Sequence, residues 1–390
     1  MKTNITDNKA VIYLQGRIDS TNAPEKEMDI MGIIQDNSGK CIEFDMSELE
    51  YISSAGLRIL MKVKKIVKDE VVLSEVSSDI YEILETTGFT DIFTVKKRMR
   101  EISVEGLEII GTGFYGTVYR IDADTIIKVY DSADAIGLIE NEKKMARLAF
   151  LSGVPTAISF DIVKVGDSYG SVFELLNAKT FNDLIIESPE KNDEIIKQYV
   201  SLMKCLHGTE IQHGEVPSAK MKFLGFLDVL HDYLGDELYN RLKTLFNDLE
   251  DPDTLIHGDI QMKNVMMVDD EPMLIDMDTL AAGKPIFDLA GIYVTYQAFE
   301  EDDKDNSMAF LGISNEMCNT IWKKTLRYYY DTDDEDELNK LSDKIRIAAY
   351  VRFLNIICES SLKDGTLGET RIKHAIEHLN ELTDRVDSLN

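Results

Sequence analysis

The stretch His257-Gly258-Asp259-Ile260-Gln261-Met262-Lys263-Asn264 decides the fold of the larger part of this chain, together with Ile275-Asp276-Met277-Asp278 further on. Phosphoryl transfer from a magnesium nucleotide needs one carboxylate that accepts the proton of the attacking hydroxyl. It also needs oxygen ligands that hold the metal. Asp259 suits the first task, and Asn264 and Asp276 suit the second. The pattern therefore predicts a cleft in which these three side chains meet.

A glycine-rich segment lies upstream, at Gly111-Thr112-Gly113-Phe114-Tyr115-Gly116-Thr117-Val118. Its G-x-G-x-x-G-x-V pattern is typical of a hairpin whose backbone lies close over a triphosphate, because glycine carries no Cβ. A lone G-x-G-x-x-G also fits a dinucleotide-binding fold, in which a helix follows the glycines. Here the following residues alternate as in a strand. We therefore expect nucleotide contacts at Gly111, Gly113, Gly116 and Val118.

A second strand is predicted at Thr125-Ile126-Ile127-Lys128-Val129-Tyr130, after a turn at Asp122-Ala123-Asp124. Lys128 lies on this strand, directly after the glycine hairpin, where its ammonium can pair with the α- and β-phosphates. A surface lysine on an edge strand is the alternative, and the alternation of the strand does not exclude it. The catalytic stretch further downstream favours the phosphate-binding role.

A helix is predicted over residues 135–148, with Leu138 and Met145 on its apolar face. Such a helix would carry a glutamate that orients the strand lysine. Glu142 is the preferred candidate because it lies one turn before Met145, near the apolar face. Glu140 is the other candidate, although a solvated position is the more ordinary reading for it.

Residues 106–295 resemble the aminoglycoside phosphotransferase and choline kinase branch of the protein-kinase-like superfamily. Besides the two segments above, the resemblance depends on Val172-Phe173-Glu174-Leu175-Leu176, on the helix end Met203-Lys204-Cys205-Leu206-His207 and on Phe287-Asp288-Leu289-Ala290. His257-Gly258-Asp259 stands where most protein kinases have H-R-D, and no A-P-E element follows Asp276. These two differences favour a small-molecule acceptor over a protein.

The resemblance implies ATP with Mg²⁺ as the phosphate donor, although a hinge sequence does not separate ATP from GTP. In this family, backbone groups of the hinge hold the adenine, which here implies Glu174 and Leu176. The same resemblance implies that Lys128 is held by Glu142 and binds the phosphates.

Four further residues of the matching segments have structural readings. Asp288 is expected to brace the catalytic stretch as a hydrogen-bond acceptor. For His257 we expect a loop-bracing role, and for His207 a packed one, rather than acid–base catalysis. Asp278 is equally consistent with metal binding beside Asp276 and with an ordinary turn residue.

The first hundred residues predict a separate small open α/β domain. Strands are expected at residues 10–16, 41–45 and 71–73, and helices at 55–67 and 80–84. Ser53 or Ser54 is well placed to cap the first of these helices, with Gly56 allowing close approach.

This part resembles a STAS domain, the fold of bacterial anti-sigma factor antagonists, through Gly16-Arg17-Ile18-Asp19, Asp45-Met46-Ser47 and Tyr51-Ile52-Ser53-Ser54-Ala55-Gly56-Leu57-Arg58. Phosphoregulated members carry D-S-S-G-L, and the serine before the glycine receives the phosphate. Here Ala55 takes that position and Ser53 takes the position of the aspartate. The resemblance therefore implies a domain that binds a protein partner or restricts acceptor entry, without the usual phosphoswitch, and a helix cap is the expected duty of Ser54.

Composition limits the remaining possibilities. A chain of 390 residues with 44% apolar residues is expected to form more than one core. Cys41, Cys205, Cys318 and Cys358 have neither paired nor metal-type spacing, which predicts reduced thiols in a cytoplasmic protein. We expect no membrane partner, since no long apolar run is present. A formal charge of −29 argues against binding nucleic acid.

Two acidic runs, Glu300–Asp303 and Asp331–Glu337, are expected to be exposed loops. The second lacks the glycine of a calcium-binding EF-hand loop. In the resembling kinases, acidic residues of the helical lobe bind cationic substrates, which makes the first run a candidate for that task. Helical spacing favours a core position over an aromatic wall for a quaternary ammonium at Tyr293, Tyr296, Trp322 and Tyr328.

We therefore expect an α/β STAS-like N-terminal domain (1–98) followed by an α+β bilobal protein-kinase-like domain. Its N-lobe is expected over 99–176 and its large helical C-lobe over 177–390. The expected function is ATP–Mg²⁺-dependent phosphate transfer to a hydroxyl of a small molecule, with a cationic acceptor as one candidate and the first domain in a regulatory or interaction role. The alternative is a regulatory protein whose kinase-like part phosphorylates a protein or only binds nucleotide.

Overall fold

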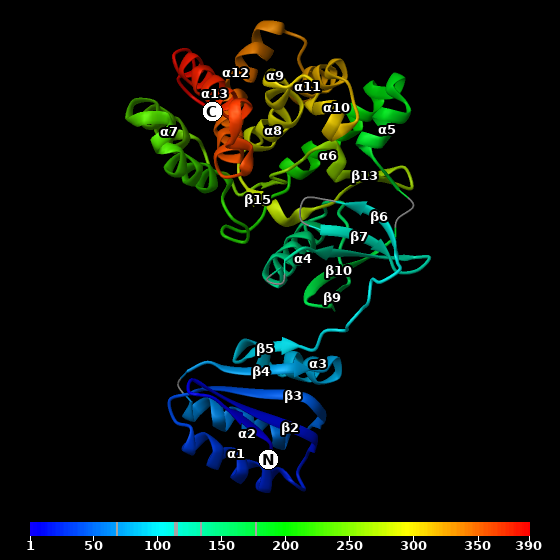
Figure 1. The fold of residues 1–390 in the computed structure, drawn as a ribbon, viewed down its shortest axis with the longest axis vertical. Helices are drawn as coiled ribbons and strands as arrows, with labels where there is room; N and C mark the ends of the chain where they lie inside the picture. The colour runs from blue at the N-terminus through cyan, green and yellow to red at the C-terminus, as the bar shows by residue number, and fades with distance from the viewer. Residues whose placement is uncertain (68, 113–115, 133–134, 176–177) are drawn as a thin grey trace. The chain divides into compact units, whose positions relative to one another are not determined.

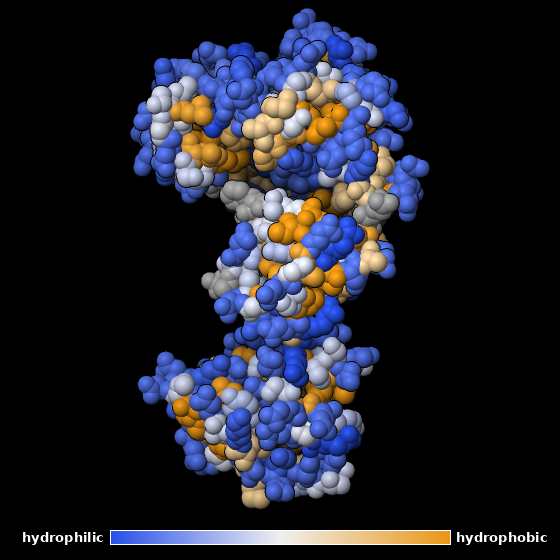
Figure 2. Space-filling view, turned by 45° about the vertical axis from the view of Figure 1, so that its right-hand side comes forward, coloured by the Kyte–Doolittle hydropathy of each residue, from blue (hydrophilic) through white to orange (hydrophobic). Residues whose placement is uncertain are grey.

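The computed structural model describes residues 1–67, 69–112, 116–132, 135–175 and 178–390. Its contacts divide the chain into two units, Met1–Ser103 with Ile162–Gly166, and Val104–Asp161 with Asp167–Asn390. Each unit has its own apolar core. Polar side chains cover most of the visible surface of each unit, with apolar side chains in patches among them (Figure 2). None of the helices within the described ranges is both long enough and apolar enough to cross a lipid bilayer.

The first unit is a five-stranded sheet with three helices (Figure 1). The strands neighbour one another in the order β1 (Thr3–Ile5), β2 (Lys9–Ile18), β3 (Cys41–Ile52), β4 (Val71–Val76) and β5 (Thr94–Lys97). Only the β1–β2 pair among them is antiparallel. The parallel strands are connected through α1 (Ala23–Asp36), α2 (Ser54–Ile66) and α3 (Ser78–Thr86). This alternation confirms the predicted α/β class.

The start of α2 combines a helix cap with a close backbone approach. The side chain of Ser53 accepts a hydrogen bond from the backbone N–H of Ala55 at 3.2 Å, so Ser53 is the cap. The capping duty expected for Ser54 was wrong, since Ser54 is the exposed first residue of the helix. A Cβ at Gly56 would lie 2.6 Å from Cγ1 of Ile52, closer than packed carbon atoms approach. Glycine at this position therefore lets α2 lie against the sheet.

The second unit begins with strands β6 (Glu108–Thr112), β7 (Gly116–Arg120), β8 (Thr125–Tyr130) and β10 (Ser168–Glu174), which neighbour one another in that order and are antiparallel. Strand β9 (Asp161–Val165) precedes β10 in the sequence, and all of its residues except Asp161 are assigned to the first unit. Helix α4 (Ile136–Leu151) follows β8 and contacts β10. The bounds of β8 are those that the sequence predicted.

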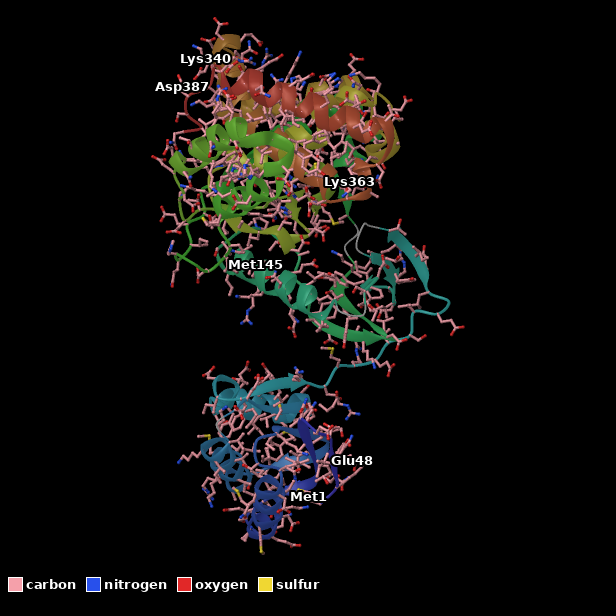
Figure 3. The ribbon with its side chains drawn as sticks, turned by 60° about the vertical axis from the view of Figure 1, so that its left-hand side comes forward. Met1, Glu48, Met145, Lys340, Lys363 and Asp387 are labelled. Atoms are coloured by element: carbon pink, nitrogen blue, oxygen red, sulfur yellow. The ribbon has the colours of Figure 1, made fainter. Side chains whose placement is uncertain are left out.

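The buried side of α4 differs by one residue from the predicted one. It consists of Ile139, Glu142, Met145, Ala146 and Ala149, of which Met145 is labelled in Figure 3. Leu138 is 60% exposed, so the prediction that it marks the apolar face was wrong. The neighbouring Ile139 is fully buried in its place.

The rest of the second unit is mainly helical (Figure 1). Its helices are α5 (Phe181–Glu187), α6 (Asn192–His207), α7 (Ala219–Asp248), α8 (Ile286–Tyr293), α9 (Phe299–Asp302), α10 (Asn306–Leu311), α11 (Asn315–Tyr330), α12 (Glu335–Cys358) and α13 (Gly365–Thr383). Gly235 interrupts α7 with a non-helical backbone, at φ 71° and ψ 161°.

Short strands cross this helical part near the catalytic stretch. One sheet has the order β11 (Lys179–Thr180), β13 (Val265–Val268) and β14 (Glu271–Leu274), and the other pairs β12 (Leu255–Ile256) with β15 (Ala281–Ala282). Single 3₁₀ turns lie at Met262–Asn264 and Met277–Thr279. Together with the antiparallel strands β6, β7, β8 and β10 and with the helices, these elements confirm the predicted kinase-like α+β class.

Helix α8 lies at the centre of the helical core. All eight of its residues are buried, and it packs against α12. The ring of Tyr293 lies 5.1 Å from that of Trp322 and 5.8 Å from that of Tyr350. Tyr296 is fully buried and has no solvent-exposed surface. Tyr293, Tyr296 and Trp322 are therefore core, as their spacing predicted. Tyr328 is only partly buried, and its hydroxyl donates to Asp193, so the core prediction was wrong for this residue.

Candidate active site

Three elements of the second unit meet at the ammonium of Lys128. Strand β8 carries this lysine, α4 carries Glu142, and Asp276 follows β14. Nζ of Lys128 pairs with Oδ1 of Asp276 and lies 3.5 Å from Oε1 of Glu142. Glu140 is exposed. The structure therefore brings Glu142, and not Glu140, to the lysine.

Burial and charge act against each other in this cluster. Burial disfavours the ammonium of Lys128, but the negative charges of Asp276 and Glu142 outweigh it and hold the pKa of Lys128 above its usual value. Burial also raises the pKa of Glu142, and the charge of Lys128 offsets only part of that rise. The hydroxyl of Tyr130 donates a hydrogen bond to Glu142. The lysine therefore stays charged in a partly buried position.

The glycine hairpin lies in register with the lysine strand. Val118 is opposite both Gly111 on β6 and Lys128 on β8. Gly116 is opposite Tyr130, and a Cβ at Gly116 would overlap the carbonyl oxygen of Val129, so only glycine fits there. The predicted contact residue Gly113 lies outside the described residues.

The predicted hinge lies at the end of β10. Glu174 is exposed and pairs with Thr125 of β8. The backbone N–H of Leu175 donates to the carbonyl oxygen of Asp124 at 2.8 Å, which ties the end of β10 to the turn before β8. The other predicted hinge residue, Leu176, lies outside the described residues.

The carboxylate of Asp259 is held by its own loop. Its Oδ2 accepts hydrogen bonds from Nε2 of Gln261 and from Nδ2 of Asn264, both at 3.1 Å. Nδ2 of Asn264 also donates to the carbonyl oxygen of Asp259 at 2.9 Å. The backbone N–H of Ile275 donates to the carbonyl oxygen of Asn264 at 3.0 Å. The catalytic stretch is therefore fastened to the residue that precedes Asp276.

Asp288 of α8 braces the start of the same loop. Its carboxylate is fully buried and accepts hydrogen bonds from the backbone N–H groups of His257 at 2.8 Å and Gly258 at 2.7 Å. Nε2 of His207 lies 3.0 Å from the carboxylate. Burial raises the pKa of Asp288, but hydrogen bonding to His207 and the charges of the two histidines outweigh it and lower that pKa. This confirms the predicted bracing role.

Both histidines of the motif have structural duties. Nε2 of His257 donates to the carbonyl oxygen of Ile275 at 3.0 Å, and its Nδ1 accepts from the backbone N–H of Asp259 at 3.3 Å. The other ring nitrogen of His207 lies 2.7 Å from the hydroxyl of Tyr329. The structural roles predicted for His257 and His207 are therefore confirmed. Gly258, which follows His257, has a left-handed backbone with φ 83°, and a Cβ there would overlap the carbonyl oxygen of Thr279.

The predicted metal ligands offer hard oxygen atoms, which Mg²⁺ prefers. Because Nδ2 of Asn264 is bound to Asp259, its carboxamide oxygen is the atom left for a cation. Oδ1 of Asp276 pairs with Lys128, which leaves Oδ2 as the oxygen that can bind a cation. The backbone of Asp276 is left-handed (φ 62°, ψ 58°). Burial and the charge of Asp276 raise the pKa of Asp278, so this carboxylate lies close by.

This donor set fits a cation that shares its ligands with phosphate. No group of three or more His, Cys, Asp or Glu side chains within the described ranges is arranged to hold a metal by itself. Mg²⁺ is usually bound through one or two protein ligands together with phosphate oxygens and water. Asn264 and Asp276 therefore suit Mg²⁺ that enters with a nucleotide.

Sequence patterns missed two residues that contact this cluster. Tyr130 follows Lys128 by two residues on the same strand, so the period of a strand indicated that both lie on one face. Arg352 of α12 donates from Nη1 to the carbonyl oxygen of Gly258, and its Nη2 lies 3.2 Å from Oδ1 of Asp259. No local pattern around Arg352 indicates this contact.

The acidic run Glu300–Asp303 was expected to be an exposed loop, and this was wrong. It lies largely in α9, and Glu300 is buried, with its carboxylate accepting from the backbone N–H of Ser307 and from Nδ2 of Asn315. The other three carboxylates have partners on other helices: Glu301 with Tyr293, Tyr350 and His378, Asp302 with His374, and Asp303 with Arg371. The run therefore ties helices of the C-lobe together.

The acidic residues of the second run are exposed, as expected, but only residues 331–334 lie in a loop. Asp334 caps α12, since its carboxylate accepts from the backbone N–H groups of Asp336 and Glu337. Glu335, Asp336 and Glu337 form the first turn, where negative charge is favoured by the helix dipole.

Comparison with known proteins gives separate matches for the two parts of the chain. A model of the STAS domain matches residues 1–102. A model of the phosphotransferase enzyme family matches residues 106–309.

Individual relatives follow the same division. BtrV of Bordetella bronchiseptica, named as an anti-sigma factor antagonist, is 36% identical over 92 residues, 23% of this chain and 78% of BtrV. An anti-sigma-B factor antagonist of Listeria monocytogenes is 30% identical over 88 residues, 22% of this chain and 76% of that protein. Among solved structures, the ADP-bound aminoglycoside phosphotransferase APH(2'')-Ib has a TM-score of 0.48 and 14% identity, over 78% of this chain and 99% of that one.

Proposed function

The chain belongs to the phosphotransferase enzyme family and carries a STAS domain, and from this premise we propose that it transfers the γ-phosphate of ATP–Mg²⁺ to a hydroxyl group of a small molecule. It is an enzyme of the phosphotransferase class, with an alcohol group as acceptor. One observation carries the proposal. A lysine, a glutamate and an aspartate from three elements meet at one ammonium, and the loop of Asp259 is hydrogen-bonded to the segment that leads into that aspartate.

In the proposed reaction, Asp259 positions the acceptor hydroxyl and takes its proton. Its carboxylate is about one-third exposed, so an acceptor can reach it, and the hydrogen bonds from Gln261 and Asn264 fix its orientation. Asn264 and Asp276 would hold Mg²⁺, which neutralises developing charge on the phosphates when it is bound. Deprotonation and metal binding are thereby assigned to different side chains of one loop system.

The donor side of the proposed site lies in the N-lobe. Lys128, oriented by Glu142, would bind the α- and β-phosphates. Backbone atoms around Gly111, Gly113, Gly116 and Val118 would lie along the triphosphate, and the backbone of Glu174 and Leu176 would hold the base. GTP fits the same description, because a backbone hinge can bind either purine.

The acceptor is proposed to be a small molecule, since the motif departs from that of protein kinases at Gly258. A cationic acceptor gains no support from Glu300–Asp303, because those carboxylates have partners within the C-lobe. The domain bounds that accompany this proposal are 1–98, 99–176 and 177–390. The cytoplasm is the proposed compartment, since all four cysteines have free thiols.

For the STAS domain we propose a regulatory or interaction role. Relatives of this part are named anti-sigma factor antagonists, which supports binding of a protein partner. Ala55 carries no hydroxyl, so the proposed role does not use phosphorylation at that position.

The test is a screen for transfer of radiolabelled γ-phosphate to amino sugars, amino alcohols and peptides, with Asp259→Asn run beside the wild type. We expect transfer to at least one small acceptor and a loss of about 10²- to 10⁴-fold in the variant, as for removal of a general base. Asp253→Asn, which changes a half-exposed carboxylate outside the site, should keep wild-type activity. Equal transfer by the wild type and Asp259→Asn would remove Asp259 as the base.

A different result would favour the regulatory alternative. If the nucleotide raises the melting temperature of the wild type and of Asp259→Asn equally, and no ATP is consumed with any acceptor, the second unit senses nucleotide without turnover. Transfer confined to the peptides would instead make the chain a protein kinase.

A further inference from the structure

Arg352 of α12 is the one residue of the described ranges outside the catalytic stretch that hydrogen-bonds to the carboxylate of Asp259. Its two terminal nitrogen atoms do different work. Nη2 lies 3.2 Å from Oδ1 of Asp259, and Nη1 donates to the carbonyl oxygen of Gly258. The guanidinium therefore binds the peptide of Gly258 and the side chain of Asp259 at the same time. The fixed planar arrangement of its N–H groups allows this, whereas the ammonium of a lysine lacks that arrangement.

The two carboxylate oxygens of Asp259 have different kinds of support. Oδ2 accepts from Gln261 and Asn264, which belong to the same loop and move with it. Oδ1 accepts from Arg352, whose backbone belongs to a helix of 24 residues. Arg352 therefore ties the position of the carboxylate to the helical core.

The peptide of Gly258 is held from both sides. Its N–H donates to Asp288 of α8 at 2.7 Å, and its carbonyl oxygen accepts from Arg352 of α12. Helices α8 and α12 pack against each other, so the two anchors form one support. A flexible loop that is held at successive atoms by a rigid core keeps its reactive group in place.

Space for the guanidinium comes from Gly291 of α8. A Cβ at Gly291 would lie 3.1 Å from Nη1 of Arg352, which is tighter than ordinary packing, and 3.4 Å from Cζ. Gly291 is buried in a helix, where alanine is the more stable residue in isolation. The missing side chain therefore makes room for Arg352.

From these contacts we infer that Arg352 is a positioning residue of the phosphotransfer site, which sets the orientation of the Asp259 carboxylate from outside the catalytic loop. The inference rests on the proposed function, in which Asp259 receives the proton of the acceptor. Arg352 lies beyond residues 106–309, the span that the phosphotransferase family model matches. Nucleotide binding is assigned to Lys128 and Asp276, so Arg352 acts on turnover and not on the affinity for ATP.

The experiment compares full-length wild type with Arg352→Met, Arg352→Lys and Gly291→Ala. The rate of Mg²⁺-ATP hydrolysis, with water as the acceptor, is measured at saturating and limiting ATP, so that no acceptor needs to be known. We expect kcat to fall about 10- to 100-fold in Arg352→Met, as for a misplaced catalytic group, with KM for ATP within about twofold of wild type. Arg352→Lys should recover part of kcat, and Gly291→Ala should lose several-fold because its methyl group displaces the guanidinium.

Arg346→Met is the matched control. Arg346 lies on the same helix with a similarly exposed side chain, and it pairs with Asp343 at 3.3 Å and with the hydroxyl of Tyr350. Its loss should lower the melting temperature about as much as Arg352→Met, with kcat unchanged. The inference is overturned if Arg352→Met keeps wild-type kcat, if its KM for ATP rises in proportion, or if Arg346→Met loses as much kcat.

Crystal structures of the wild type and Arg352→Met separate this inference from the proposed function. If the wild type neither hydrolyses ATP nor transfers phosphate, the proposed function fails. The structures then decide the role of Arg352 alone. A shifted Asp259 carboxylate together with a rotated Gly258 carbonyl supports positioning, and unchanged positions of both overturn it.

Discussion

The start of α2 in the first unit and the catalytic loop of the second unit solve the same packing problem with different chemistry. In each, the chain leaves a strand and a glycine lies against a neighbouring segment, Gly56 against Ile52 and Gly258 against Thr279. At α2 the polar side chain of Ser53 caps its own helix, and Ser54 is exposed. In the catalytic loop the polar side chains bond to one another and to buried groups of the helical core.

The two regions therefore differ in the interactions that they need: packing stabilises the fold at α2, and connected hydrogen bonds position the reactive groups in the catalytic loop. At the start of α2, Gly56 packs against apolar neighbours and one serine caps the helix, while Ala55 stands at the position of the phosphoserine of phosphoregulated STAS members. A site that performs chemistry needs connected polar partners. Its parts are therefore expected to be more sensitive to polar substitutions, while the start of α2 is expected to be sensitive to volume.

The largest expected effect comes from Asp288→Asn. An amide offers one acceptor oxygen where the carboxylate accepts at both, so a buried N–H of the catalytic loop loses its partner. We expect a loss of about 2–4 kcal/mol in the free energy of unfolding of the second unit and at least a tenfold fall in turnover. Denaturant unfolding and initial rates measure the two effects. Unchanged values of both would mean that α8 does not brace the loop.

The same substitution has a pH signature. The pKa of Asp288 is lowered in the folded protein, so its contribution to stability is present above the unfolded value of about 3.9 and is lost as the pH falls through the folded value. The difference in unfolding free energy between the wild type and Asp288→Asn should therefore shrink on acidification below about pH 4. A difference that grows on acidification would contradict this assignment.

Gly56→Ala tests the volume-sensitive region. The added methyl group would lie 2.6 Å from Ile52 and 2.9 Å from Ile18, so we expect the first unit to lose about 1–3 kcal/mol of stability while phosphotransfer is retained. Gly32→Ala on α1 is the matched control, because nothing lies within 4 Å of its added Cβ. The control should be neutral or slightly stabilising. Equal destabilisation by both substitutions would mean that packing at Gly56 is not special.

Tyr130→Phe tests a smaller polar connection in the second unit. It keeps the ring and removes the hydroxyl that donates to Glu142, which loosens the partner of Lys128. We expect KM for ATP to rise about 3- to 10-fold with little change in kcat, consistent with the loss of one hydrogen bond to a charged group. Tyr169→Phe on β10 serves as the control, and it should leave KM unchanged. A fall in kcat at constant KM would show that Tyr130 acts elsewhere.

The smallest expected effect is that of Ala55→Ser. It restores a hydroxyl in the first turn of α2 at a partly exposed position, and the cap at Ser53 remains. Unfolding free energy and phosphotransfer activity should change by less than about 0.5 kcal/mol and by less than twofold, respectively. A larger destabilisation would show that the polar and packing roles are not separable here.

Local patterns predicted the parts of the site that are encoded within one or two neighbouring elements. The strand at Thr125–Tyr130 and the choice of Glu142 over Glu140 follow from the periods of a strand and a helix. The periods alone did not locate the buried side of α4, because Leu138 and Ile139 are both apolar and only tertiary packing selects Ile139. Adjacent apolar residues on an amphipathic helix leave this choice open.

Contacts between distant segments could not be predicted in the same way. Arg352 reaches Asp259 across 93 positions of sequence, and nothing in α12 marks it apart from other helical arginines. The run Glu300–Asp303 has the composition of a solvated loop, yet its partners Arg371, His374 and His378 lie on a helix much later in the chain. A charged residue reveals its environment only when the segment that packs against it is known.

Two independent requirements act on the residue at position 276: a left-handed backbone (φ 62°, ψ 58°) and a side-chain carboxylate that pairs with Lys128. Glycine relieves the backbone but offers no oxygen, and asparagine tolerates the conformation but carries no charge to balance Lys128. Glutamate keeps the charge on a longer arm and fits the backbone poorly. The backbone conformation and the charge of Lys128 therefore restrict which amino acids can occupy position 276, independently of any requirement for catalysis.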